Sequence, residues 1–223
     1  MNPLKHPKTW WTVFLVVGVL VASCSPSPEA SEDVERPADI ASNQDRKDIE
    51  AVKAEIQALA DQVGVPGGFK DFPVIVVSKY PGQDGPLAYC HESQNRSARY
   101  IGIVKATMET YLSEQHSHQD SSFLFKLLVH EYGHCFFDRG HDETMVGKPG
   151  YNIFIVLLDE NGTNLKPIGT EIAVSAMASI NWWMTDLPRD LKKYYLREIA
   201  GQVRWHKFED LQTQPGIRLL RAE

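Results

Sequence analysis

The apolar segment SSFLFKLLVHEYGHCFF, residues 121–137, is the feature that most constrains the fold. Its length and composition predict a buried α-helix, and Asp120 or Ser121 is available as its N-cap. His130 and His134 are four residues apart, so both imidazoles lie on one face of this helix and can reach a single metal ion. The helix therefore carries a candidate metal site.

Glu131 completes the pattern H-E-x-x-H, which is typical of zinc hydrolases. It lies one residue round the helix from His130, which places it better to reach a metal-bound water than the metal. Zinc lowers the pKa of such a water to about 7, and a carboxylate can take its proton during attack on a carbonyl. The pattern predicts zinc bound by His130 and His134, with Glu131 as general base. The competing interpretation is two histidines that pack or cap within a helix, beside a solvated Glu131.

A catalytic zinc needs a third protein ligand, and the continuation HEYGHCFFDRGHD offers candidates. His141 follows the helix, and Gly140 immediately before it is free to turn the chain back. Asp142 and Glu171 are the rival ligands. Asp142 could instead orient a histidine as a hydrogen-bond acceptor. The spacing alone leaves these three candidates open.

The extended motif H-E-x-G-H-C-x-x-x-R-x-H-[DN] resembles that of a group of bacterial metzincin-like metallopeptidases, many of them lipoproteins. The resemblance covers roughly residues 45–200. It includes a tyrosine–cysteine pair, a β-rich segment, a Met-turn and a C-terminal helix with paired tyrosines, which correspond to Tyr89-Cys90, RYIGIV, Ser175-Ala176-Met177 and LKKYYLREI. The resemblance implies the following roles: His130, His134 and His141 as zinc ligands, Glu131 as general base, and Met177 as the Met-turn residue.

This sequence departs from the metzincin pattern in two places. His141 lies one residue later than in H-E-x-x-H-x-x-G-x-x-H, and Ala176 stands where the Met-turn usually has isoleucine. Met177 could therefore be an ordinary core methionine among alanines and isoleucines.

The N-terminus reads as a signal for export. Lys5 and Lys8 precede an apolar run at 10–22, which makes about 20 Å of helix and is shorter than a bilayer core of about 30 Å. The ending VASC resembles the lipobox of bacterial lipoproteins and implies that Cys24 carries a lipid anchor. Ser25, where aspartate would favour retention in the inner membrane, points to the outer membrane. We therefore expect a lipid-anchored protein of the bacterial cell envelope.

Two cysteines, Cys90 and Cys135, remain once Cys24 is lipidated. An even pair in an exported protein suggests a disulfide, and both positions match the family, so the resemblance implies a Cys90–Cys135 bridge. The alternative is two buried free thiols.

The rest of the sequence predicts an α+β fold with a small mixed β-sheet packed against the motif helix and a C-terminal helix. The resemblance implies that this fold is zincin- or metzincin-like. We expect helices at 45–64, 106–116 and 187–202, and strands at 72–78, 86–91, 99–105 and 151–158.

Three parts of the chain follow from these patterns. Residues 1–23 are the signal peptide, residues 24–44 are the lipidated cysteine and a disordered tether rich in Ser, Pro and acidic residues, and residues 45–223 are the metallopeptidase domain. The chain is 43% hydrophobic, which suits one domain with a core. A net charge of −6 without a basic stripe excludes nucleic acid as an expected partner.

The sequence thus predicts a membrane-anchored zinc metallopeptidase with a protein or peptide substrate. By analogy with metzincins, the substrate would lie along an edge strand, for which RYIGIV is the candidate. The alternatives are a non-catalytic zinc-containing lipoprotein that binds or stabilises without cutting, and an amidase that acts on cell-wall peptides.

Overall fold

The computed structural model describes residues 36–80, 87–116, 122–147, 153–158, 162, 165–178 and 187–221. The chain divides into two units, Met1–Val34 and Glu35–Glu223, and every described residue belongs to the second. The signal peptide, Cys24 and most of the expected tether therefore lie outside the described residues. In the described part, no helix has the length and apolar character needed to cross a membrane.

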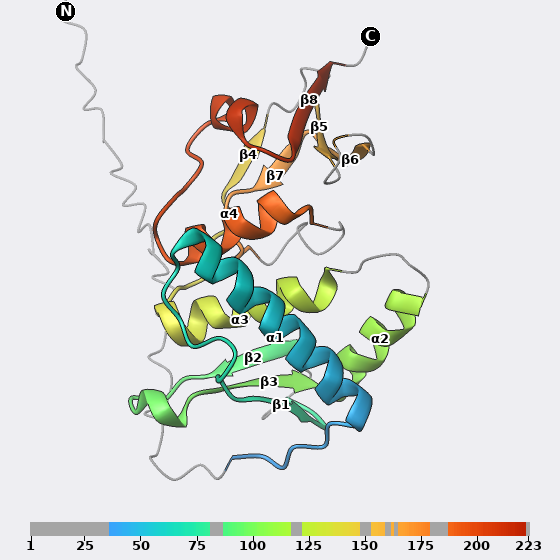
Figure 1. Cartoon of the computed structure of the whole chain (residues 1–223), viewed down its shortest axis with the longest axis vertical. Helices are drawn as coiled ribbons and strands as arrows, with labels where there is room; N and C mark the ends of the chain where they lie inside the picture. The colour runs from blue at the N-terminus through green and yellow to red at the C-terminus, as the bar shows by residue number, and fades with distance from the viewer. Residues whose placement is uncertain are drawn as a thin grey trace, which may run out of the picture. The chain divides into compact units, whose positions relative to one another are not determined.

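The second unit contains both helices and short strands, which agrees with the α+β prediction at the level of mixed α and β structure (Figure 1). In chain order the described elements are α1 (Asn43–Val63), β1 (Val74–Val77), β2 (Ala88–His91), η1 (Arg96–Ala98), β3 (Tyr100–Val104), α2 (Lys105–His116), α3 (Phe123–Phe137), β4 (Met145–Gly147), β5 (Ile153–Leu158), β6 (Leu165–Gly169), β7 (Glu171–Ala173), α4 (Arg189–Ile199), η3 (Phe208–Thr213) and β8 (Ile217–Arg221).

The first sheet is mixed, as predicted, and has the strand order β1-β3-β2. Strand β3 pairs in parallel with β1 and antiparallel with β2. The segment RYIGIV is therefore the central strand, and its expected role as an edge strand is wrong. Residues 100–103 are all buried, which suits a strand covered on both faces. Among the described residues β2 pairs with β3 alone, so β2 is the edge strand next to α3.

Two further small sheets follow α3, where the sequence predicted one strand. One pairs β4 with β7, and the other has the antiparallel order β6-β5-β8. The predicted strand at 151–158 appears as β5, at the centre of its sheet. The partners of β5 were not recognised in the sequence, because β6 and β8 carry polar residues and a proline that weaken a strand pattern.

The folded unit begins a few residues before the predicted boundary at residue 45. Ser42 caps α1 in a reciprocal capping box with Asp45. Upstream of the cap, the backbone N–H of Ile40 donates to Val76 in β1 (2.9 Å), and the carboxylate of Asp39 accepts the N–H of Val76 (3.1 Å). The last residues of the expected tether are thus part of the fold.

Helix α3 lies at the centre of the core. It packs against α1, α4 and the strands β2 and β3, and Figure 1 shows it between the first sheet and α4. Most of its side chains are buried in one continuous apolar cluster. The N-cap is Ser122, one residue after the predicted candidates, and its hydroxyl accepts the N–H of Leu187 instead of capping the helix (3.0 Å).

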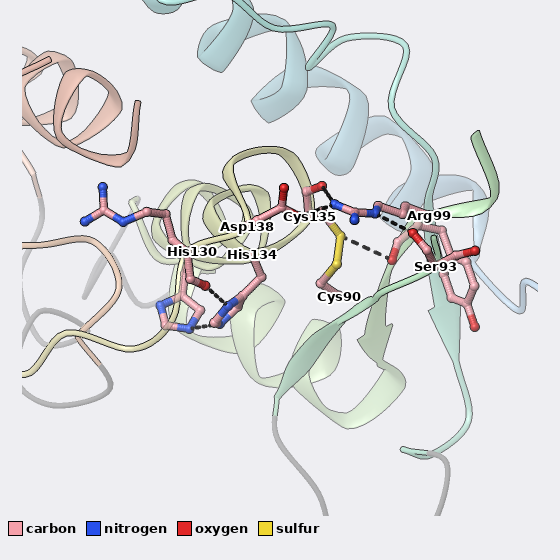
Figure 2. The surroundings of a disulfide bond; sticks show 9 residues. Cys90, Ser93, Arg99, His130, His134, Cys135 and Asp138 are labelled. Atoms are coloured by element: carbon pink, nitrogen blue, oxygen red, sulfur yellow. Dashed lines mark hydrogen bonds and ion pairs between the residues drawn. A yellow bond between two sulfur atoms is a disulfide. The ribbon is translucent and has the colours of Figure 1, made fainter. Parts of the chain in front are cut away.

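The edge strand β2 is covalently joined to α3 by a disulfide between Cys90 and Cys135 (Figure 2). Arg99, between β2 and β3, adds a second connection. Its guanidinium donates to the Cys135 carbonyl at the end of α3 (2.7 Å) and to the backbone carbonyl of Ser93 (2.9 Å). These contacts fix the edge strand beside the helix that carries the histidines.

Removing the disulfide should lower stability without unfolding the core. The bridge has a sequence separation of 45, and closing a loop of that size contributes about 4 kcal/mol on the chain-entropy model. We expect the double substitution Cys90→Ser with Cys135→Ser to lower the free energy of unfolding by about 2–4 kcal/mol. Urea denaturation followed by tryptophan fluorescence measures this change.

A reductant supplies the control for this prediction. Dithiothreitol should destabilise the wild type by a similar amount and leave the double variant unchanged. Equal denaturation midpoints for the wild type and the double variant would contradict the predicted contribution of the bridge.

Candidate metal centre

Three histidines from two adjoining segments converge on one point. His130 and His134 extend from successive turns of α3, and His141 comes from the loop that follows the helix. One ring nitrogen from each lies within 4.8 Å of the other two. His130 is buried, His134 is half-buried and His141 is exposed, so the cluster opens to solvent on the His141 side. These three residues could hold a metal ion.

Backbone hydrogen bonds orient the two helical imidazoles. The Nδ1 atom of His130 lies 2.8 Å from the Ala176 carbonyl oxygen, and the Nδ1 atom of His134 lies 2.7 Å from the Arg139 carbonyl oxygen. A carbonyl only accepts hydrogen bonds, so both Nδ1 atoms must carry the proton. In a neutral imidazole the Nε2 atom then presents a lone pair, which is the form that binds a metal.

The two Nε2 atoms point toward each other at 3.2 Å (Figure 2). With both ring protons on Nδ1, neither Nε2 can donate to the other, and the two lone pairs repel unless a cation lies between them. Two nitrogen ligands of a tetrahedral zinc at 2.0–2.1 Å are about 3.3 Å apart, close to the observed separation. The geometry of the pair therefore fits a shared metal ion.

Burial keeps these ligands neutral at physiological pH. It lowers the pKa of His130 to about 4, although the hydrogen bond to Ala176 acts in the opposite direction. Burial also lowers the pKa of His134. Neutral imidazoles bind metals and imidazolium ions do not, so both rings are in the competent form at pH 7.

A left-handed turn at Asp138 brings His141 back to the helix. Asp138 is the C-cap of α3, with φ 49° and ψ 38°, and it is the one non-glycine residue with positive φ in the described part of the chain. Arg96 and Arg99 hold its carboxylate, at 3.0 and 2.6 Å. The expected turn at Gly140 is wrong, because Gly140 does not have positive φ and the reversal occurs two residues earlier.

The rival third ligands have other environments. The carboxylate of Asp142 pairs with Arg204 and accepts the hydroxyl (2.6 Å) and the N–H (3.1 Å) of Thr144. The hydrogen bond from Arg204 holds the pKa of Asp142 at about 2. Glu171 is an exposed residue of β7. Of the three candidates, His141 is the one that the structure brings to the other histidines.

Met177 lies against the helix between the two histidines. It is fully buried, and a Cβ at Gly133 would come within 2.1 Å of its sulfur atom. Gly133 is therefore required for the close approach of this segment to α3. The neighbouring Ala176 carbonyl holds His130, and the Met177 carbonyl accepts the backbone N–H of Asp142 (3.2 Å). The segment 175–177 thus packs against α3 and holds His130 and the backbone next to His141 in place.

Glu131 is buried beside the edge strand. Glu131 is 5% exposed, and its carboxyl group lies near the backbone of Cys90 in β2. Burial raises the pKa of Glu131 to about 8, although the backbone N–H of Cys90 acts in the opposite direction. A carboxyl group with a pKa in this range can both take and return a proton near neutral pH.

Ala176 belongs to the expected Met-turn and Arg139 to the extended motif, but Glu198 carries no motif in the sequence. Its side chain accepts the guanidinium of Arg139 across 59 residues of the chain. One signal for Glu198 was available: it follows Leu191, Tyr194 and Tyr195 at helical spacing, on the apolar face of α4.

Comparisons with known proteins give no match. No family model matches the chain, and no curated protein or solved structure matches it significantly.

Replacing the third histidine should release the metal. We expect the wild-type chain to bind about one zinc ion and the His141→Ala variant to retain far less, because two imidazoles are too few for a stable zinc site. Elemental analysis of the purified chain after dialysis measures the zinc content.

The Glu171→Ala variant is the matched control, since Glu171 is a rival ligand on an exposed strand. It should keep the wild-type zinc content. Equal zinc in the wild type and in His141→Ala would rule out His141 as the third ligand.

Proposed function

We propose that this chain is a zinc-dependent metallopeptidase of metzincin-like fold, anchored by lipid in the bacterial cell envelope. The observation that carries the proposal is the convergence of three histidine nitrogens, two of them oriented by backbone carbonyls, beside a buried carboxylate. A site that only stabilises the fold would have no need of Glu131 next to its ligands. The motif in the sequence and the geometry of the site therefore support the same reaction.

The choice of zinc follows from the donors. Three imidazoles in a half-exposed site suit a borderline metal with one coordination position left for water or substrate. His130, His134 and His141 would hold the ion. Bound there, zinc would polarise a peptide carbonyl and lower the pKa of the attacking water.

Glu131 is the proposed general base. It would take the proton of the attacking water and return it to the leaving amine of the cleaved peptide bond. Its burial favours this role, because a desolvated carboxylate binds a proton more readily than a solvated one.

Strand β2 is the proposed binding edge for an extended peptide. It is the sheet edge next to α3, and the Cys90–Cys135 disulfide holds it there. A peptide that added to this edge would bring its backbone carbonyls past the three histidines. This assignment replaces RYIGIV, which is central in the sheet.

The metzincin-like fold is supported by the segment below the helix. In metzincins a Met-turn underlies the metal, and here Met177 packs against Gly133 between the two histidines. The mixed sheet with an antiparallel edge strand beside the motif helix is a second point of agreement.

Removing the base should abolish hydrolysis while leaving the metal in place. Glutamine keeps the shape of glutamate but cannot carry the proton, so Glu131→Gln should bind about one zinc and lose at least about 100-fold in turnover. Hydrolysis of a fluorogenic peptide library and zinc analysis together measure this.

The Glu171→Gln variant is the matched control, because Glu171 is an exposed carboxylate of β7 outside the histidine cluster. It should keep its activity. A Glu131→Gln variant with unchanged turnover would contradict the assigned base. A zinc-loaded wild type that cleaves no peptide in the library would favour the non-catalytic lipoprotein.

The anchor can be tested separately from the chemistry. Cys24→Ser removes the thiol to which the lipid would be attached, so this variant should lack the lipid mass and leave the membrane fraction. Mass spectrometry and cell fractionation measure the two effects. A Cys24→Ser chain that still carries a lipid and sediments with membranes would contradict the lipobox assignment.

A further inference from the structure

Glu198 is a buried carboxylate at the end of α4 that has no part in the proposed reaction. It is 1% exposed, and it follows the apolar face of the helix formed by Leu191, Tyr194 and Tyr195. A carboxylate at such a position is costly unless each oxygen is paired. The partners of its two oxygens lead to the metal-binding histidines.

The first oxygen, Oε2, holds the segment below the helix. It accepts the hydroxyl of Ser175 (2.7 Å) and the backbone N–H of Ala176 (3.3 Å). The same Ser175 hydroxyl accepts the N–H of Met177 (3.0 Å), which closes the turn. The carbonyl of Ala176 is the acceptor that orients His130. Ala176 therefore connects Oε2 to His130, the first ligand.

The second oxygen, Oε1, holds the loop that follows α3. It accepts the guanidinium of Arg139 (2.8 Å), and the same side chain also donates to the backbone carbonyl of Glu198 (3.0 Å). The backbone carbonyl of Arg139 is the acceptor that orients His134. The contacts of the Arg139 side chain with Glu198 thus fix the position of the Arg139 carbonyl that orients His134.

The third ligand is reached through Arg204. Its guanidinium lies 3.7 Å from Oε1 of Glu198 and pairs with the carboxylate of Asp142, the residue after His141. The N–H of Asp142 also donates to Met177 in the turn that Oε2 supports. Both oxygens of Glu198 therefore converge on the backbone beside His141.

We infer that Glu198 is the positioning residue of the metal centre, a single buried carboxylate that sets the orientation of all three histidines through their backbone neighbours. The inference rests on the proposed metal site and adds to it the element that keeps the site in shape. A carboxylate is needed because both oxygens act as acceptors. An amide would place its own donor against either the N–H of Ala176 or the guanidinium of Arg139, and neither of these groups can accept a hydrogen bond.

The test is the affinity of the full chain for zinc in the Glu198→Gln variant. Loss of the partners that orient metal ligands typically costs 10–100-fold in metal affinity, and we expect a rise in the zinc Kd of about that size. Competition with a chromophoric chelator measures the Kd at a temperature where circular dichroism shows both proteins folded. Cobalt(II) supplies a spectroscopic readout, because its d–d absorption should change in position and intensity as the three imidazoles move.

Tyr195→Phe is the matched control for a merely structural effect. Its hydroxyl makes a buried hydrogen bond from the same helix to the Ala173 carbonyl (2.9 Å), three residues before Ala176. This variant should lose stability but keep the wild-type zinc Kd and cobalt spectrum. If Glu198→Gln does not fold, Ser175→Ala removes one contact of Oε2 and should raise the zinc Kd at least about fivefold.

The outcomes separate the two proposals. If the wild type binds zinc and Glu198→Gln has the same zinc Kd and cobalt spectrum, only the role of Glu198 is overturned. If Glu198→Gln does not fold, the same result in Ser175→Ala overturns that role. A wild type that binds neither zinc nor cobalt would overturn the metal site and this inference with it.

Discussion

The two lone pairs that face each other across 3.2 Å, on Nε2 of His130 and Nε2 of His134, are the constraint on which the site depends. Each ring is turned into this position by a carbonyl on its opposite nitrogen, at Ala176 and at Arg139. The Arg139 carbonyl is five residues from His134, whereas the Ala176 carbonyl is 46 residues from His130, so the arrangement forms only when the segment around Ala176 has packed against α3. In the absence of a cation the arrangement is electrostatically unfavourable, which is the physical reason to treat it as a metal centre.

The same helix also fixes the edge of the first sheet. The Cys90–Cys135 disulfide joins strand β2 to the helix one turn after Glu131, and the guanidinium of Arg99 donates to the Cys135 carbonyl near the end of the helix. Metal ligands, proposed base and edge strand are therefore held by one rigid element. A peptide bound along β2 would meet the base and the metal in fixed register, which favours reaction by lowering the entropy cost of alignment.

Local patterns predicted the parts of this structure that depend on neighbouring residues. The apolar run at 121–137 predicted helix α3, and the spacing of His130 and His134 predicted that their side chains share one face of it. The spacing of apolar residues at 45–64 predicted helix α1. Strand order was missed, because RYIGIV and PLAYCH are both short β-rich segments and their pairing is non-local. The turn was placed at Gly140 for its conformational freedom, whereas Asp138 adopts it with help from Arg99, 39 residues upstream. Glu198 was missed for the same reason, since its contact to Arg139 spans 59 residues.

The coordination shell of the bound metal is the most direct test of the central claim. Zinc K-edge X-ray absorption of the whole chain measures the number and type of ligands. We predict three imidazole nitrogens and one further light atom at about 2.0–2.1 Å. A sulfur ligand at about 2.3 Å, or fewer than three imidazoles, would contradict it.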